Sequence, residues 1–287
     1  MWGRMYRDKQ GGMNGIAIRG PNPSRELGRG MNEAQVRSGS DGAILFDPAA
    51  CGSARPDDAW FDPAHWASQG RAEVQSGGRG GVAFVDTPAG ACVLRHYHRG
   101  GLMARLSADR YLWTGERRTR AFREFRLLSQ LAGSNLPVPA PIAARYRRDG
   151  MYYQADLIVR RIPGVRTLAE RLASGTLDPS LGERVGDTIA RFHAAGAYHA
   201  DLNAHNILVD DREVVWLIDF DRGELRKPAL AWQQANLARL RRSFEKLGAK
   251  KRVAGFDARF WHPLLSAYHA ALAREPVAAT VCTTKPI

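Results

Sequence analysis

The sequence is poor in cysteine and contains no long apolar run. Its 287 residues include three cysteines, Cys51, Cys92 and Cys282. Because their number is odd and their spacing is wide, they fit neither a disulfide framework nor a metal-binding pair, and we expect reduced, mostly structural thiols. No stretch of about 18 apolar residues occurs, which argues against a membrane-spanning helix. The first residues also lack the apolar segment of a secretory signal.

Acidic residues are scarce as well. The chain has 29 Asp and Glu against 42 Lys and Arg, a formal net charge of +13. The excess is concentrated in residues 95–126, with nine Arg against three acidic residues, and in residues 236–252, with seven Lys or Arg against one Glu. Such segments attract polyanions, either nucleic acid or an anionic lipid surface. Because no zinc finger or aromatic RNA-binding strand pair accompanies them, we expect no nucleic-acid partner. A solvated, Arg-rich helix face is the simpler alternative.

What the chain does contain is an Asp, an Asn and a second Asp in a specific order. Asp201 lies in the segment HADLNAHN, Asn206 follows it by five residues, and Asp219 follows Asn206 by 13 residues, directly after the apolar segment 214–218. Protein kinases carry a general base and two magnesium ligands at this spacing, written H-R-D-L-x-x-x-N and D-F-G. Since Mg²⁺ prefers carboxylate and amide oxygens, Asn206 and Asp219 are predicted metal ligands, and Asp201 is the predicted catalytic base. A turn shaped by Asp and Asn is the alternative.

A glycine-rich segment lies upstream of a predicted strand. Gly78 and Gly80, followed by Ala83 and Val85, approximate the nucleotide-covering loop G-x-G-x-x-G-x-V, with Ala83 in the third glycine position. Glycines would let backbone N–H groups approach the phosphates of ATP. A plain hairpin turn fits this segment almost as well.

The next predicted strand, residues 91–95, ends in a cation. Arg95 stands where kinases usually carry the phosphate-binding Lys, and an Arg can both hold phosphate oxygens and pair with a carboxylate. Glu124 is the best candidate partner, because it lies beside the apolar stripe of a predicted helix over residues 120–128. Pairing of Glu124 with Arg120 on the surface of the same helix is the alternative.

The order of elements predicts an α+β, two-lobed, protein-kinase-like fold. We expect a small N-terminal antiparallel sheet with one helix over residues 31–162 and a larger helical C-terminal lobe over residues 163–275, with Pro163-Gly164 as the hinge. Residues 1–30 and 276–287 are expected to be tails. Capped helices are predicted to begin after Asp62, Thr167 and Asp178, and residues 230–274 are predicted to form two further helices.

Five segments resemble a known family, the 3-deoxy-D-manno-octulosonic acid (Kdo) kinases among the lipopolysaccharide-modifying kinases. The first, residues 93–102, holds the arginine-ended strand and the Tyr-x-Arg-Gly-Gly run after it. The other four are residues 109–113, 120–128, 199–206 and 219–223. The resemblance spans roughly residues 75–270. It implies ATP-dependent phosphorylation of the 4-hydroxyl of Kdo on a Kdo-lipid A precursor, with Asp201 as the base and Asn206 and Asp219 as ligands of Mg²⁺. It also implies a peripheral enzyme on the cytoplasmic side of the inner membrane, where the basic segments would meet an anionic glycolipid and leaflet.

Three departures from the protein-kinase pattern bear on the acceptor. Ala200 replaces the Arg before the catalytic Asp, and no A-P-E triplet follows Asp219. Both argue for a small-molecule or glycolipid acceptor, although a protein or antibiotic acceptor on the same fold remains the alternative. Asp221 stands where D-F-G has Gly, and the sequence leaves open whether it binds metal or pairs with Arg222. A pseudokinase or membrane-adaptor module is a third interpretation, since Arg95 and the residue in the third glycine position both depart from the pattern.

Overall fold

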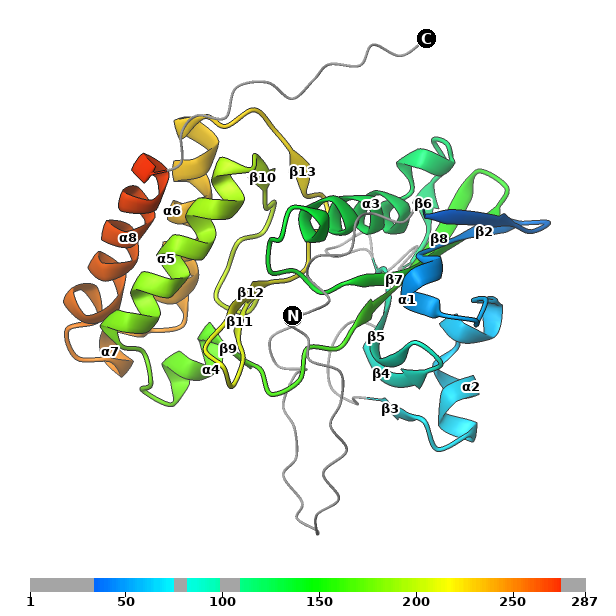
Figure 1. Ribbon diagram of the computed structural model, residues 1–287, viewed down its shortest axis with the longest axis horizontal. Coiled ribbons are helices and arrows are strands. Elements are labelled where there is room, and N and C mark those ends of the chain that lie inside the picture. The colour runs from blue at the N-terminus through cyan, green and yellow to red at the C-terminus, as the bar shows by residue number, and fades with distance from the viewer. Residues whose placement is uncertain (1–33, 75–81, 99–108, 275–287) are drawn as a thin grey trace.

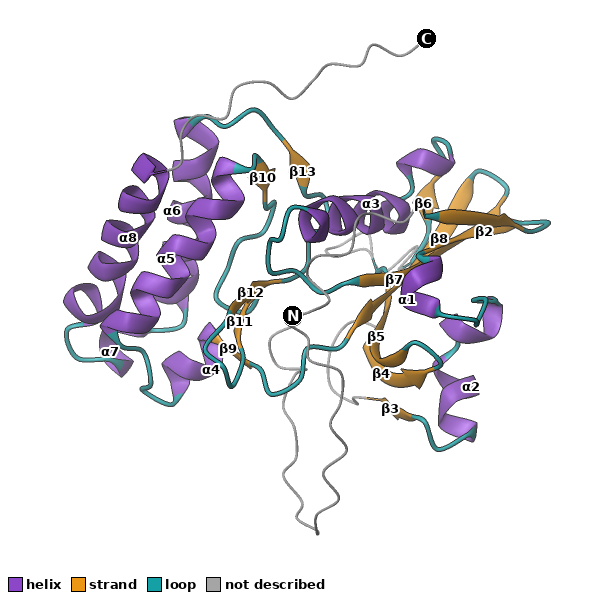
Figure 2. Ribbon diagram, viewed as in Figure 1, coloured by secondary structure: helices purple, strands orange, loops and turns teal. Residues whose placement is uncertain are grey.

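The computed structural model describes residues 34–74, 82–98 and 109–274 of the chain. A sheet-rich part and a helix-rich part lie side by side, joined by the segment that follows the last long strand (Figure 1). The sheet-rich part, at right in Figure 2, carries one long helix, and the helix-rich part, at left, carries only short strands. This is the α+β, two-lobed arrangement predicted from the sequence. The predicted lobe boundary at residues 162–163 stays a prediction, and the two predicted tails lie outside the described residues.

An antiparallel sheet forms the N-terminal lobe. Its strands follow one another across the sheet in the order β1 (Gln35–Ser38), β2 (Gly42–Phe46), β7 (Pro141–Asp149), β8 (Tyr152–Arg160), β5 (Gly90–His96), β4 (Val82–Thr87) and β3 (Ala72–Val74), while β6 (Tyr111–Leu112) pairs with the start of β8. Successive side chains of a strand point to opposite faces. In β5, Val93 therefore enters the core on one face, while Cys92 and Leu94 enter the core on the other. Both faces of this sheet are covered.

Different elements cover the two faces. On one face lies α3 (Arg120–Gly133), which buries Phe122, Phe125 and Leu128 and is preceded by the short turn η5 (Glu116–Arg118). On the other lie α1 (Pro48–Cys51), η3 (Asp58–Phe61) and α2 (Pro63–Ser68), which bury Trp60 and Trp66 against the sheet. The aromatic side chains bring large apolar areas into these contacts, so each face has its own core.

The C-terminal lobe is built on helices. Its elements are β9 (Arg166–Thr167), α4 (Leu168–Ala173), α5 (Pro179–Ala194), β10 (Ala197–Tyr198), β11 (Ile207–Val209), β12 (Val215–Leu217), β13 (Glu224–Leu225), α6 (Leu230–Lys246), α7 (Ala249–Arg252), the π-helical turn η6 (Asp257–Trp261) and α8 (His262–Arg274). The predicted starts of three helices are confirmed: Asp62, Thr167 and Asp178 each accept a backbone N–H with the side chain, and Thr167 forms the capping box with Glu170.

Two glycines allow close packing within this lobe. A Cβ on Gly186 of α5 would overlap the carbonyl oxygen of Leu264 in α8, and a Cβ on Gly182 would lie 2.5 Å from the carbonyl oxygen of Phe260. The backbones of α5 and of the η6–α8 segment therefore approach too closely for any other side chain at these positions.

The prediction of two helices over residues 230–274 was wrong. The segment forms α6, α7, η6 and α8 instead. Gly248 and Gly255 take left-handed backbone conformations, with φ of +73° and +67°, between these pieces. A glycine adopts positive φ without steric cost, and it therefore ends the helical run at both places.

The two described cysteines match the expectation from the sequence. Cys51 and Cys92 are free and buried, and burial raises the pKa of the Cys92 thiol to about 11. Cys282 lies outside the described residues. Within the part of the chain that the structure describes, no helix is long and apolar enough to cross a membrane.

Candidate active site

A short hairpin brings the predicted metal ligands to one end of the helical lobe. β11 and β12 pair antiparallel with Ile207 opposite Leu217, so the residues just before β11 meet the residues just after β12. The backbone N–H of Ile218 donates to the carbonyl of Asn206 at 3.0 Å. Asn206 and Asp219, 13 residues apart in sequence, are thereby neighbours across the hairpin.

His199 ties the catalytic loop to the same end of the hairpin. Its Nδ1 lies 3.1 Å from the backbone N–H of Asp201 and accepts that hydrogen, while its Nε2 lies 2.9 Å from the carbonyl of Ile218 and donates to it. These partners require the neutral ring with its proton on Nε2. Burial lowers the pKa of His199, which keeps the ring neutral. The imidazole therefore holds the loop of Asp201 against the residue that precedes Asp219.

Asn206 presents a buried oxygen toward this end of the hairpin. Its Nδ2 donates to the backbone carbonyl of Asp201 at 3.0 Å, and the residue is only 1% exposed. Its Oδ1 is buried and has no hydrogen-bond partner among the described residues. A buried polar atom normally finds a partner, and an amide oxygen is a ligand that hard cations accept. The residue types and this orphaned oxygen fit a magnesium ion beside Asp219.

Asp219 is held in an unusual backbone conformation. Its φ is +63°, in the left-handed region, which Asp tolerates better than most residues. Behind it, Phe220 is buried, stacks on Phe192 of α5 with ring centroids 5.8 Å apart, and contacts the ring of His199. The packing of Phe220 anchors the backbone next to Asp219, whose side chain is 21% exposed. Backbone strain of this kind recurs at functional sites.

Arg95 joins the sheet, α3 and Asp219. Its Nη1 donates to Asp219 Oδ1 at 2.8 Å and lies 3.3 Å from Glu124 Oε1. Burial disfavours the charge of Arg95, but the two carboxylates outweigh it and raise the pKa of the guanidinium. Burial also raises the pKa of Glu124, against the opposing effect of Arg95. Tyr97 supports the pair, because its hydroxyl donates to Glu124 Oε2 at 2.5 Å. The predicted Arg95–Glu124 contact is therefore present. Tyr97 stood in the Tyr-x-Arg-Gly-Gly run that resembles the family, but its hydrogen bond to Glu124 was not anticipated.

Asp221 pairs with an arginine from α3. Arg120 Nε donates to Asp221 Oδ1 at 2.8 Å, and a second contact joins Arg120 Nη2 to Oδ2. Arg95 Nη2 lies 3.9 Å from the same carboxylate. Pairing with Arg222, one of the two roles considered from the sequence, is therefore not the contact that forms. The surface pairing of Arg120 with Glu124, the alternative considered for α3, is not the contact that forms, because Arg120 pairs with Asp221.

Asp201 faces outward from the loop. Its side chain is 65% exposed, and its Oδ2 accepts a hydrogen bond of 3.0 Å from Asn203 Nδ2. Arg239 of α6 lies beside it, with Nη1 3.8 Å from Asp201 Oδ1. An exposed carboxylate that a neighbouring amide orients is free to meet the hydroxyl of an acceptor.

Two predicted glycines and two arginines remain to be placed. Gly78 and Gly80 lie outside the described residues, between β3 and β4, which pair antiparallel. Sequence reasoning considered Arg120 only as a partner of Glu124, and Arg239 only as part of the basic segment 236–252. The position of Arg239 three residues after Asn236 could have marked it, because residues at this spacing share a helix face.

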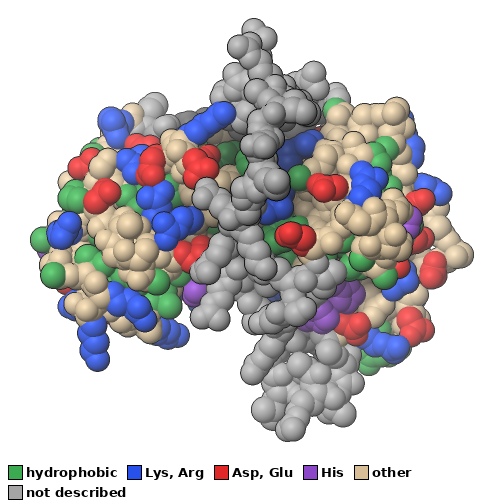
Figure 3. Space-filling view, turned by 90° about the horizontal axis from the view of Figure 1, so that it is seen from below, with side chains coloured by type: hydrophobic (Ala, Val, Ile, Leu, Met, Phe, Trp, Pro, Cys, Tyr) green, Lys and Arg blue, Asp and Glu red, His purple; other side chains and the backbone are tan. Residues whose placement is uncertain are grey.

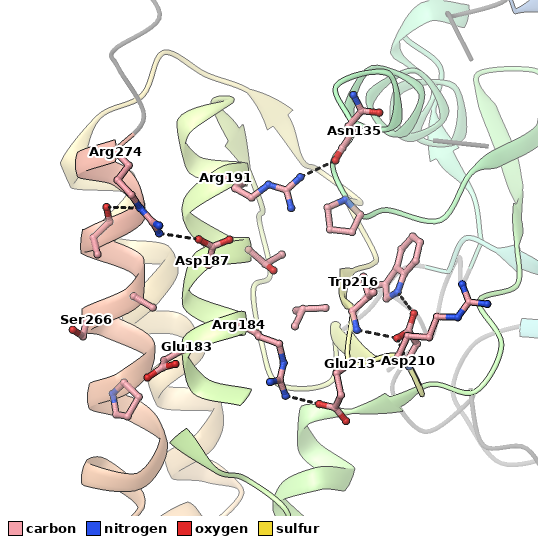
Figure 4. A pocket seen from close by; sticks show the side chains of 18 residues that line it. Asn135, Glu183, Arg184, Asp187, Arg191, Asp210, Glu213, Trp216, Ser266 and Arg274 are labelled. Carbon is pink, nitrogen blue, oxygen red and sulfur yellow. Dashed lines mark hydrogen bonds and ion pairs between the residues drawn. The ribbon is translucent and has the colours of Figure 1, made fainter. Parts of the chain in front are cut away.

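A pocket lies away from these residues. It has a volume of about 710 Å³ and opens between α5, α8, the β11–β12 turn and the segment after α3 (Figure 4). None of the described residues predicted for catalysis, metal or nucleotide lines it. Three of the arginines that line it pair with a carboxylate or with the backbone: Arg184 with Glu213, Arg274 with Asp187, and Arg191 with the carbonyl of Asn135. The residues of the predicted reaction centre lie elsewhere.

The class of protein follows from the order of these parts along the chain. An antiparallel sheet joined to its one long helix by a buried cation–carboxylate pair precedes the Asp–Asn–Asp arrangement of the helical lobe, as in protein-kinase-like phosphotransferases. Across the described residues, the fold and the contacts define a kinase.

Comparison with known proteins narrows this class to a family. Residues 63–268 match the family model of the lipopolysaccharide kinase (Kdo/WaaP) family. A 3-deoxy-D-manno-octulosonic acid kinase of Stenotrophomonas maltophilia (strain R551-3) is 54% identical over 213 residues, which are 74% of this chain and 84% of that protein. A protein of the same name from Xanthomonas axonopodis pv. citri (strain 306) is 53% identical over 207 residues, 72% of this chain and 81% of that protein. The chain belongs to the lipopolysaccharide kinase (Kdo/WaaP) family.

Proposed function

We propose that this kinase transfers the γ-phosphoryl group of ATP to the 4-hydroxyl of Kdo on a Kdo-lipid A precursor, in the assembly of the lipopolysaccharide inner core. Two observations support the proposal: relatives of 53–54% identity carry the name of Kdo kinase, and hydrogen bonds join the loop of Asp201 and Asn206 to the residue before Asp219. The orphaned Oδ1 of Asn206 beside Asp219 is the observation that favours an active phosphotransferase over an adaptor module.

Asp201 acts as the base in this proposal. Its exposed carboxylate, oriented by Asn203, accepts the proton of the acceptor hydroxyl as the oxygen of that hydroxyl bonds to the γ-phosphorus. The bond between the γ-phosphorus and the bridging oxygen breaks, and ADP leaves. The proton stays on Asp201 until water removes it.

The residues around Asp219 serve the nucleotide. Asn206 and Asp219 would hold Mg²⁺, which neutralises phosphate charge when bound. Arg95 supplies a forked cation for phosphate oxygens, and Glu124 and Tyr97 keep it in place. Gly78 and Gly80 are proposed to cover the phosphates with backbone N–H groups.

The acceptor also suggests where the enzyme works. We propose a peripheral position on the cytoplasmic side of the inner membrane, where an excess of Lys and Arg attracts an anionic leaflet by about 1 kcal/mol for each basic residue at the surface. On the coloured parts of the face in Figure 3, Lys and Arg side chains alternate with Asp and Glu over both lobes. The segment 236–252, with seven basic residues and one acidic residue, is a stronger candidate for that contact. Binding to anionic vesicles that is insensitive to salt and to neutralisation of this segment would contradict the membrane proposal.

A transfer assay with labelled ATP tests the function. It compares a Kdo-lipid A precursor, the same precursor without Kdo, and a generic protein, and we expect label only in the first. Asp201→Asn should abolish transfer and leave the unfolding temperature unchanged within a few degrees, because the side chain is 65% exposed. Full transfer by Asp201→Asn would remove the proposed base, and label in the protein substrate would favour the alternative acceptor.

A further inference from the structure

Helix α6 is anchored on the catalytic loop at two points. Asn236 of α6 accepts from the backbone N–H of His199 at 3.3 Å and donates to the carbonyl of His199 at 3.1 Å. About two turns further along, Ser243 Oγ accepts from the backbone N–H of Ala204 at 3.1 Å. Because both anchors are hydrogen bonds to the loop backbone on either side of Asp201, the position of α6 relative to that residue is well defined.

Arg239 lies between the two anchors and reaches the predicted base. Its Nη1 is 3.8 Å from Asp201 Oδ1, and its side chain is 45% exposed. An exposed ion pair at this distance contributes at most about 1 kcal/mol to stability. Stabilisation of the fold therefore gives little reason for an arginine at this position. Its guanidinium remains accessible to a further anion.

Two more cations continue from Arg239 on the same side of the helix. Arg242 and Lys246 follow it by three and seven residues, and all three are exposed. Residues at these spacings form one stripe, and the stripe is about 10 Å long at the rise of an α-helix. Arg241, in contrast, points elsewhere and pairs with Asp257 and Glu245. We call Arg239, Arg242 and Lys246 the α6 cation row.

We propose that the α6 cation row binds the anionic groups of the acceptor, with Arg239 holding the oxyanion nearest to the hydroxyl that is phosphorylated. The inference rests on the proposed function, because Asp201 accepts the proton of that hydroxyl. An acceptor sugar placed against Asp201 brings an anionic substituent of the same ring, or of the next one, within reach of Arg239. A guanidinium holds a carboxylate or a phosphate through two parallel hydrogen bonds, which also orients the sugar.

Steady-state kinetics of Arg239→Gln test the row, with the acceptor in neutral detergent micelles so that membrane binding does not enter. A charge-assisted hydrogen bond contributes roughly 1.5–3 kcal/mol, so we expect KM for the acceptor to rise about 10- to 100-fold while KM for ATP changes less than about twofold. Arg239→Lys should recover part of the loss. Arg259→Gln removes one exposed positive charge outside the row and serves as the matched control.

Two altered acceptors distinguish the sources of the anion. In one the Kdo carboxylate is a methyl ester, and in the other the lipid A phosphates are removed. If Arg239 binds the carboxylate, Arg239→Gln and wild type become equal on the ester; if it binds a phosphate, they become equal on the dephosphorylated acceptor. A loss that persists in full on both, a rise in KM for ATP alone, or a profile equal to that of Arg259→Gln would overturn the inference. A wild-type enzyme that transfers to no Kdo acceptor would overturn the proposed function first, and the inference with it.

Discussion

Replacing Asp221 with asparagine removes one charge from a largely buried ion pair and keeps the size of the side chain. Asp221 and Arg120 are each 17% exposed and share two contacts, one of them at 2.8 Å. In Asp221→Asn, Arg120 would keep its 2.6 Å hydrogen bond to the hydroxyl of Tyr111 and its position over the ring of that residue. The variant therefore leaves a cation that is mostly buried and only partly satisfied.

The expected cost follows from this partial compensation. Removing one partner of a buried pair costs about 3–5 kcal/mol, and since Arg120 retains Tyr111 and some solvent, we expect roughly 2–3 kcal/mol here. For a protein of this size that loss lowers the unfolding temperature by about 4–6 °C. Asp187→Asn is the control, because Asp187 pairs with Arg274 at 3.2 Å with the two side chains 46% and 71% exposed. Such an exposed pair contributes less than about 1 kcal/mol.

A double-mutant cycle with denaturant unfolding measures the pair directly. Asp221→Asn, Arg120→Gln and the double variant should show a coupling energy of about 2 kcal/mol. Amide hydrogen exchange should rise in α3 and in residues 218–225 of both single variants, since the pair joins these segments. If Asp221 were instead a metal ligand, Asp221→Asn would raise the magnesium concentration needed for half-maximal activity and Arg120→Gln would not. A coupling energy near zero, or a loss no larger than that of Asp187→Asn, would refute the reasoning.

Two further predictions concern stability. Gly186→Ala should lower the free energy of unfolding by about 1–3 kcal/mol in thermal or denaturant melts. Overlap of the new Cβ with the carbonyl of Leu264 outweighs the gain of about 1 kcal/mol in helix propensity. Equal or greater stability would contradict the close α5–α8 contact. Burial lowers the pKa of His193, whose Nδ1 lies 2.8 Å from the hydroxyl of Tyr268, from 6.5 to about 4. The unfolded chain therefore binds more protons than the folded protein between these values, and stability should fall by about 3 kcal/mol as the pH drops from 6.5 to 4, with a shallower fall in His193→Gln; identical pH profiles would count against a buried neutral His193.

Much of the fold could be predicted because its signals are local. The capping side chains Asp62, Thr167 and Asp178 lie next to the helices that they start, and each was found where the pattern indicated. The division of residues 230–274 was missed, because Gly248 alone in a helical pattern does not reveal whether the chain turns there or continues.

Residue types and their spacing along the chain were enough to select the residues of the candidate site. Asp201, Asn206 and Asp219 could be selected in advance because a loop and a short hairpin impose their spacing, and that spacing survives any change in the surroundings. The Arg95–Glu124 pair could be anticipated in the same way, since the type of each residue and the order of the two elements limit the partners.

The residues that support this centre, and those that face it, could be found only in the folded chain. Asp221 joins Arg120, 101 residues away in the chain, and Arg239 reaches Asp201 from a helix that begins 29 residues after it. Charge attracts any opposite charge within reach, so a sequence with 42 basic residues offers many possible partners for each carboxylate. The choice among them is made by the packing of α3 and α6, because hydrogen bonds and ion pairs act over a few ångströms and only the folded chain sets those distances.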